Sequence, residues 1–187
     1  KTLAEQEAWK IGEAQDRWDL VVINPSAVLG PGLNTTTNIS ESINLVKQLA
    51  DGTLKSGAPK LGIGAVDVRD VADAHYNAGF IPEAKGRHIT SAHNTSFLEM
   101  AQILNKKYGD SYPIPNKAVP KWLLYIVGPM VNKALTWKYI GNNINHPWRA
   151  NNSKIKKELN MNFRPLEESL VDTFEDLVAN KIIQPKK

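Results

Sequence analysis

One continuous apolar run, Leu20-Val21-Val22-Ile23, limits what this chain can fold into more than any other feature. A strand with one face in water alternates apolar and polar residues, whereas an uninterrupted β-branched run is typical of a strand buried on both faces, as in a parallel sheet. The following segment, from Asn24 to Thr37, is rich in Pro, Gly, Asn and Thr and predicts a loop. We therefore expect a parallel strand whose carboxyl end opens into a crevice, where open α/β sheets bind ligands.

Helical patterns surround this strand. Apolar residues recur at helical spacing in several segments, and Asn38 with Glu41, like Ser96 with Glu99, has the spacing of a capping box. The expected helices cover residues 1–11, 38–49, 71–78, 96–109, 153–159 and 165–178, with one or two short helices within 122–135. A second short strand is expected at Arg87–Thr90. Helices alternating with few strands predict the α/β class.

Composition excludes several functions. The net charge of +4 is spread along the chain, and no aromatic residues interleave with the lysine clusters as a base-stacking surface would need. There is no cysteine, which excludes disulfides and thiolate metal sites within this sequence. The longest apolar run, residues 122–127, is far shorter than the roughly 20 residues of a membrane span. We expect a cytoplasmic protein with no nucleic-acid or membrane partner.

Two sequence blocks resemble the extended short-chain dehydrogenase/reductase family, especially its dihydroflavonol, cinnamoyl-CoA and methylglyoxal reductases. The blocks are Lys1-Thr2-Leu3-Ala4-Glu5 and Asn24-Pro25-Ser26-Ala27-Val28-Leu29-Gly30-Pro31. In that family a catalytic Tyr-x-x-x-Lys motif on a helix precedes a Leu-Ala-Glu-like stretch, a strand and Asn-Pro-x-x-Val-x-Gly-Pro. Lys1 matches the lysine of the motif, and its tyrosine would precede this sequence. The resemblance implies the C-terminal half of such an enzyme.

The resemblance also implies an architecture. Residues 1–92 would complete a Rossmann-like parallel-sheet core with an inserted helix, and residues 93–187 would form a mainly helical substrate-side lobe with a closing helix. The family's C-terminal Ser-Lys…Leu-Gly pattern reappears near Ser153, except that Asn160 replaces the glycine. Asparagine tolerates the same left-handed conformation. The half that cradles the dinucleotide is expected upstream, so the isolated chain would be inactive and would associate with that half or form homo-oligomers.

The implied activity is reduction of a small carbonyl substrate with NADP, or NAD, as cofactor. Lys1 would bind the nicotinamide ribose and lower the pKa of the tyrosine, since a cation within about 4–6 Å favours the phenolate. Pro25 and Val28 would position the nicotinamide, with Ser40 assisting, although Ser40 could equally be only a helix cap. The loop 32–37 and the region 111–147 would shape the substrate pocket.

Other interpretations remain open at this point. The same scaffold supports sugar-nucleotide epimerases or dehydratases, and a non-catalytic NAD(P)-binding regulator would keep the fold without the chemistry. The stretch Gly62–Asp67 lacks the third glycine of a dinucleotide fingerprint and is rejected as one. Asp67, Asp70 and Asp73 do not form a glycine-spaced calcium loop, so no metal site is expected. His75, on the apolar side of its predicted helix, is expected to be a packing residue.

Overall fold

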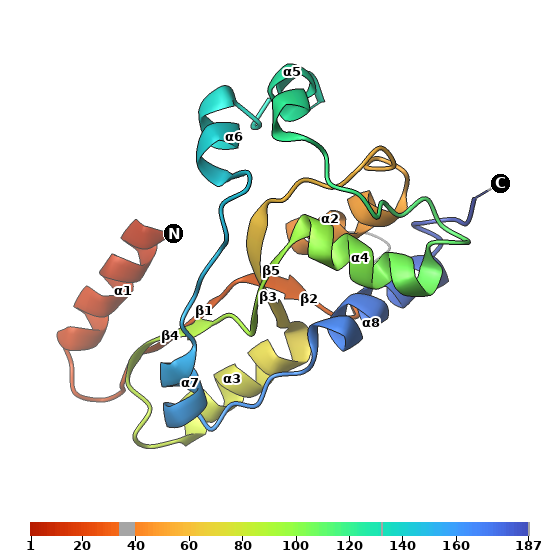
Figure 1. Cartoon of the computed structure of the whole chain (residues 1–187). Helices are drawn as coiled ribbons and strands as arrows, with labels where there is room; N and C mark the ends of the chain where they lie inside the picture. Colours follow the sequence, from red (N-terminus) through yellow and green to blue (C-terminus); the bar gives the residue numbers. More distant parts are fainter. Residues whose placement is uncertain (34–39, 132, 187) are drawn as a thin grey trace.

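The computed structural model describes residues 1–33, 40–131 and 133–186, which form a mixed α/β fold. Helices surround two small sheets, and the chain ends lie on opposite sides of the molecule (Figure 1). The elements are α1 (Thr2–Glu13), β1 (Val21–Pro25), β2 (Ala27–Leu29), α2 (Glu41–Ala50), β3 (Gly62–Asp67), α3 (Val68–Phe80), β4 (Gly86–Thr90), β5 (His93–Ser96), α4 (Phe97–Tyr108), α5 (Lys121–Val131), α6 (Trp137–Asn143), α7 (Ser153–Glu158) and α8 (Leu166–Ala179).

The predicted parallel pairing is confirmed. β1 runs parallel to β4, with Ile23 opposite His88. The second sheet has the order β2-β3-β5, in which β2 is parallel and β5 antiparallel to β3. The expectation that Leu20 to Ile23 is buried on both faces was wrong, because these residues are only half-buried. In the part of the chain that the structure describes, β4 is the only strand that pairs with β1, so the other edge of β1 is not covered by a strand.

The main core lies between the three-stranded sheet and three helices. Figure 1 shows α2, α4 and α8 gathered beside β2 and β3, and Leu49, Leu104 and Phe174 from these helices are fully buried there. The Phe174 ring stacks on Tyr108, with 4.1 Å between ring centroids. This core combines elements from both predicted segments, 1–92 and 93–187, and their division remains a prediction.

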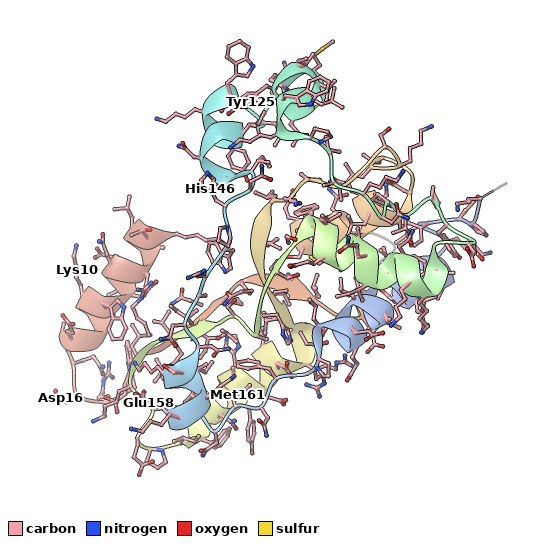
Figure 2. All side chains as sticks on the ribbon, in the orientation of Figure 1. Lys10, Asp16, Tyr125, His146, Glu158 and Met161 are labelled. Atoms are coloured by element: carbon pink, nitrogen blue, oxygen red, sulfur yellow. The ribbon has the colours of Figure 1, made fainter. Side chains whose placement is uncertain are left out.

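A second core joins α3 and α7 to the two-stranded sheet. Ala74, Ile155 and Leu159 are fully buried in it, and α7 contacts β4. Figure 2 shows Met161 close to α3, where the chain turns towards α8. The turn contains Asn160 with φ 51°, which confirms the predicted left-handed conformation at this position.

Helix caps explain where two helices begin. Ser96 accepts a hydrogen bond from the Glu99 backbone N–H at 3.3 Å, as the capping-box spacing predicts. At α2 the helix-cap alternative stated for Ser40 is confirmed: Ser40, and not Asn38, precedes the helix and accepts from the Ile43 N–H at 3.3 Å. The predicted cap residue, Asn38, lies outside the described residues.

Two parts of the fold project from the body, α1 and the pair α5–α6 (Figure 1). α1 has no buried residue, and Leu3 and Ile11 on its predicted apolar face are exposed. α6 is held to α5 by a 3.0 Å hydrogen bond from Trp137 Nε1 to the Tyr125 carbonyl. Among the described residues, no helix is both long and apolar enough to span a membrane.

His88, in the middle of β4, is completely buried and should make the protein acid-sensitive. Burial lowers its pKa, and the nearby charge of Lys154 lowers it further, while Glu158 acts in the opposite direction. As the pH falls through about 6.5, His88 therefore becomes protonated in the unfolded chain while it stays neutral in the folded state. The stability contributed by neutral His88 is complete above about pH 6.5 and falls by up to about 1.4 kcal/mol per pH unit below it.

We expect His88→Gln to flatten the dependence of unfolding free energy on pH between about 6.5 and 5. Urea denaturation at several pH values measures this slope. His75 provides the control: the structure places it at the surface rather than in a packed position, with Nδ1 2.8 Å from the Val71 carbonyl oxygen. An unchanged slope in His88→Gln would exclude His88 as its source.

Candidate functional site

The structure brings Lys1 to the carboxyl end of β1. Lys1 is the exposed cap residue of α1 and lines a cavity of about 380 Å³ together with Asn24. Asn24 Nδ2 is buried and has no hydrogen-bond partner among the described residues. The predicted catalytic lysine and the first residue of the Asn-Pro block therefore share one cavity, with Pro25 the next residue along the strand.

An ion pair sets the position of α1 over β4. Arg87 Nε donates to Glu5 Oε1 at 2.5 Å, and Trp9 Nε1 donates to the same oxygen at 3.3 Å. The hydrogen bond from Arg87 lowers the pKa of Glu5, so this carboxylate stays ionised near neutral pH. Lys1 forms no ion pair with any described residue, and it lines the same cavity.

Val28 and Ser40 lie close to one another through a residue that sequence reasoning missed. The Val28 backbone N–H donates to Ser42 Oγ at 3.2 Å, which ties β2 to the first turn of α2. Ser40 caps the same turn. No local pattern singles out Ser42, because a serine in a first helical turn is common. The binding roles of Pro25, Val28 and Ser40 remain predictions.

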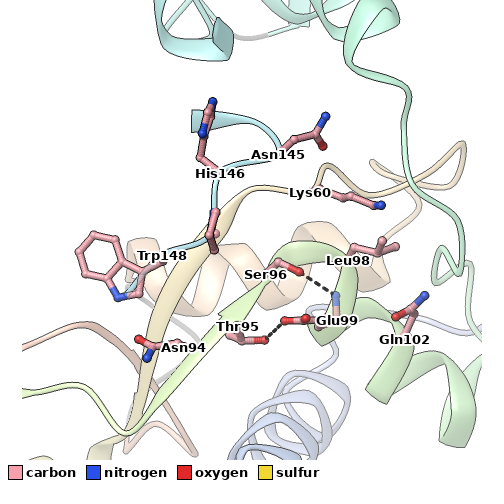
Figure 3. Close-up of a pocket in the computed structure, with 12 residues that line it drawn as sticks. Lys60, Asn94, Thr95, Ser96, Leu98, Glu99, Gln102, Asn145, His146 and Trp148 are labelled. Carbon is pink, nitrogen blue, oxygen red and sulfur yellow. Dashed lines mark hydrogen bonds between the residues drawn. The ribbon is translucent and has the colours of Figure 1, made fainter. Parts of the chain in front are cut away.

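A larger cavity of about 570 Å³ lies on the three-stranded sheet. Figure 3 shows it between β5, the start of α4 and the segment 145–148, with Trp148 on one side and Lys60 on the other. Its lining residues are Lys60, Gly62, Asn94, Thr95, Ser96, Leu98, Glu99, Gln102, Asn145, His146, Pro147 and Trp148. Sequence reasoning placed only 145–147 of these near a substrate pocket.

The segment 145–152 crosses this sheet closely, and two glycines make room for it. A Cβ at Gly62 would clash with the backbone of Trp148, and one at Gly64 would lie 2.5 Å from Trp148 Nε1. Asn94 holds the segment through Ala150: its Oδ1 accepts from the Ala150 N–H at 2.9 Å, and its Nδ2 donates to the Ala150 carbonyl at 3.4 Å. The two glycines, which resembled part of a nucleotide fingerprint, thus allow residues 145–152 to pack closely on the sheet. We call residues 145–152 the crossing segment.

Acidic residues at the end of β3 and in the first turn of α3 form ion pairs. The guanidinium of Arg69 bonds both carboxylate oxygens of Asp67, at 2.8 and 2.7 Å. Burial by itself would raise the pKa of Asp67, but hydrogen bonds from Arg69 and Ser169 outweigh it and the pKa is lowered. Asp70 is likewise fully buried and paired with Arg164. The described residues contain no group of three or more potential metal-binding side chains.

The sequence of this chain was compared with those of known proteins. The chain matches no family profile, but it resembles several curated plant reductases. It is 34% identical over 181 residues to cinnamoyl-CoA reductase 2 of Medicago truncatula, covering 95% of this chain and 45% of the relative. Cinnamoyl-CoA reductase 1 of Arabidopsis thaliana is 34% identical over 185 residues, covering 99% and 46%. An anthocyanidin reductase of Vitis vinifera is 33% identical over 150 residues, covering 74% and 43%.

Solved structures share the fold. Yeast methylglyoxal/isovaleraldehyde reductase Gre2, complexed with NADPH, superimposes with a TM-score of 0.68 at 25% identity, covering 96% of this chain and 54% of that one. Vestitone reductase from alfalfa gives a TM-score of 0.71 at 22% identity, covering 98% and 51%. The chain thus spans about half the length of the relatives it matches. It belongs to the extended short-chain dehydrogenase/reductase family, in the group of the cinnamoyl-CoA and anthocyanidin reductases.

Proposed function

We propose that this chain contributes the substrate-side half of an NADPH-dependent carbonyl reductase and acts together with a dinucleotide-binding half of the family fold. The observation that supports this proposal best is the 34% identity to a cinnamoyl-CoA reductase across 95% of the chain. The NADPH in the Gre2 complex supports the choice of cofactor. The substrate class is a small carbonyl compound, and a cytoplasmic location is part of the proposal.

The cavity beside Lys1 fits the nicotinamide end of this cofactor. Asn24 Nδ2 is a buried donor without a partner among the residues that the structure describes, and a carboxamide or ribose oxygen would satisfy it. The ammonium of Lys1, which has no ion-pair partner within the described ranges, lies on the same cavity and can bind ribose hydroxyls. Pro25 removes one backbone donor beside Asn24, which suits contact with a flat ring. When bound, NADPH supplies the hydride; the residues of this chain orient it.

The proton for the substrate would come from the motif's tyrosine, which would precede this sequence and which Lys1 would assist. A cation near a phenol stabilises the phenolate and lowers its pKa, which matches the phenol better to proton transfer near neutral pH. We propose that Ser40 and Ser42 help to place the nicotinamide by fixing α2 against Val28. A homo-oligomer, or noncovalent association of two half-chains, is compatible with the exposed apolar face of α1.

The function is tested with the full-length protein that contains this chain. NADPH oxidation is followed by absorbance with methylglyoxal and with cinnamoyl-CoA, and UDP-galactose is incubated separately with NAD. We expect carbonyl-dependent oxidation of NADPH and no change in the sugar nucleotide. Epimerisation of UDP-galactose without net cofactor consumption would assign the protein to the epimerases, and cofactor binding without either reaction would make it a regulator.

A further inference from the structure

We propose that the projecting pair α5–α6 docks on the surface of an anionic phospholipid bilayer. α5 is apolar on all its sides, because residues 122–130 include no charged residue and no polar side-chain group except the hydroxyl of Tyr125. A helix that is apolar all round is normally buried in the protein or in a membrane. Within the part of the chain that the structure describes, α5 is covered on one side only.

The uncovered side of α5 is a stripe of large apolar side chains. Trp122, Ile126 and Met130 follow one another at four-residue spacing, which places them on one face of the helix, and they are 65%, 60% and 84% exposed. Trp137 is 70% exposed, and the hydrogen bond from its Nε1 to the Tyr125 carbonyl holds its indole against α5. We call Trp122, Ile126, Met130 and Trp137 the apolar patch. Exposed apolar surface of this kind marks a site of contact with another surface.

Positive charge adjoins the apolar patch. Residues 111–157 contain seven lysines and one arginine but no aspartate or glutamate, so all 19 acidic residues lie elsewhere in the chain. Lys133 lies between α5 and α6, and Lys138 follows Trp137 in α6. Both lysines are exposed, and neither forms an ion pair with a residue that the structure describes. Lysines beside tryptophan and large aliphatic side chains are typical of helices that bind the interface of an anionic bilayer.

The charge beside the patch favours lipid over a second copy of this chain. In a two-fold contact the same surface faces itself, so Lys133 and Lys138 of the two copies would approach each other. Residues 111–157 offer no carboxylate to pair with them. The headgroups of an anionic bilayer supply the missing negative charge, and the cytoplasmic leaflet of membranes carries such headgroups.

The shape of the fold permits this contact. The pair α5–α6 projects from the body in Figure 1, and Lys121 Nζ joins the two helices by donating to the carbonyls of Gly141 and Ile144, both at 3.0 Å. α5 has 11 residues, fewer than the roughly 20 that a membrane span needs, so it would lie in the interface. The expectation of no membrane partner rested on the short apolar run, which excludes a span and not a surface contact.

Vesicle flotation tests the docking surface without any turnover, so the result does not depend on the reductase function. Full-length protein is mixed with vesicles of phosphatidylcholine alone or of equal parts of phosphatidylcholine and phosphatidylglycerol. We expect the protein to float with the mixed vesicles and to bind phosphatidylcholine alone about 10-fold more weakly. Raising the salt concentration from about 0.1 M to about 1 M should weaken the binding, because salt screens the attraction between lysines and headgroups.

One charge change at two exposed apolar positions provides a matched pair of variants. Met130→Glu places a carboxylate in the apolar patch and should reduce binding to the mixed vesicles by about 10-fold. Phe80→Glu makes the same kind of change on α3, at a side chain that is 72% exposed, and should bind like the unchanged protein. Circular dichroism checks that both variants are folded.

A second pair of variants tests the lysines. Lys133→Gln combined with Lys138→Gln should reduce binding to the mixed vesicles. Lys55→Gln combined with Lys106→Gln lowers the net charge by the same amount at exposed lysines outside residues 111–157, and it should reduce binding less. Equal losses in the two pairs would show that only the net charge of the protein matters.

Tryptophan quenching shows which residues reach the lipid. Brominated phosphatidylcholine in the mixed vesicles quenches the fluorescence of indoles that contact the acyl chains. We expect this quenching to be largely lost when Trp122→Phe and Trp137→Phe are combined, since phenyl rings keep the patch apolar. Trp18→Phe changes an indole that is 45% exposed and lies outside the patch, and it should leave the quenching unchanged.

The outcomes also separate the docking surface from the reductase function. Failure of the full-length protein to float with the mixed vesicles, or equal binding by Met130→Glu and Phe80→Glu, would overturn the proposal. A dimer in light scattering that Met130→Glu dissociates, without vesicle binding, would assign the patch to a second copy. Vesicle binding without NADPH oxidation would keep the docking surface and refute the reductase function.

Discussion

An Asp70→Ala variant is expected to unfold with a free energy about 3 kcal/mol smaller than that of the unchanged protein. The Asp70 side chain is fully buried and accepts a hydrogen bond from the Arg164 backbone N–H at 2.9 Å as well as from its guanidinium. Removing this carboxylate leaves the Arg164 backbone amide without its partner, and the guanidinium keeps only its longer contacts to Asp73 and Glu168. α3 would then lose one of its hydrogen-bonded contacts to the turn that leads into α8 and keep the one from Asn77 to the Leu159 carbonyl. Urea denaturation of the full-length protein measures the effect.

Asp73 provides a matched control on the same helix. Its carboxylate lies 3.7 Å from the same guanidinium, but its side chain is 62% exposed. An exposed ion pair of this kind contributes about 0–1 kcal/mol. Asp73→Ala should therefore change the unfolding free energy little. Equal losses in the two variants would show that burial is not the reason for the stability of the Asp70 pair.

The second large effect concerns catalysis. In the full-length protein, Lys1→Ala should reduce kcat/KM at neutral pH by about 10²-fold, the scale of losing support for a general acid. Without the ammonium, the pKa of the assisted tyrosine rises, so the activity profile should move to higher pH. Stopped-flow and steady-state assays across pH measure both quantities.

Lys10→Ala is the control for Lys1→Ala. Lys10 lies on the same helix, pairs with Glu7 at 2.9 Å and points away from the body in Figure 2. We expect it to keep both the rate and the pH profile. A Lys1→Ala enzyme with an unaltered rate would remove Lys1 from the proposed mechanism. A lower rate without any movement of the profile would indicate a role in cofactor binding alone.

Local sequence signals were sufficient for most of the helices and for one sheet, but α6 (Trp137–Asn143) lies outside the expected range 122–135 and was not predicted. The apolar run at 20–23 and the pattern at 87–90 predicted two strands, and they pair in parallel. The capping box at Ser96 gave the start of α4. These signals work because each depends on neighbours within a few residues, which decide backbone hydrogen bonds and the direction of the side chains.

The remaining strands could not be predicted in this way. Gly62–Asp67 has little β propensity, since glycine loses entropy and packs nothing. It forms β3 because tertiary contacts override propensity: Ala65 and Val66 are buried, and the crossing segment requires the glycines. β5 (His93–Ser96) consists of polar residues and is defined by its antiparallel pairing with β3.

The residues of the candidate site also fall into those that a sequence motif identified and those that no motif identified. Lys1 and Asn24 were recognised as parts of two motifs, and the structure brings them to one cavity. Trp148 carries no motif, and it reaches the cavity on the three-stranded sheet only through the path of the crossing segment. One clue was available in the paired glycines of β3, which indicate a close approach by another part of the chain.

The ion pair that joins α1 to β4 is sensitive to ionic strength. Lys1 belongs to a helix without buried residues, and the Glu5–Arg87 ion pair is solvent-accessible, with 63% of the Arg87 side chain exposed. Salt shortens the Debye length from about 10 Å at 0.1 M to about 3 Å at 1 M, which weakens such pairs. The orientation of the lysine at the cavity therefore depends on the electrolyte as well as on the fold, which makes salt concentration a variable to hold constant when variants of this protein are compared.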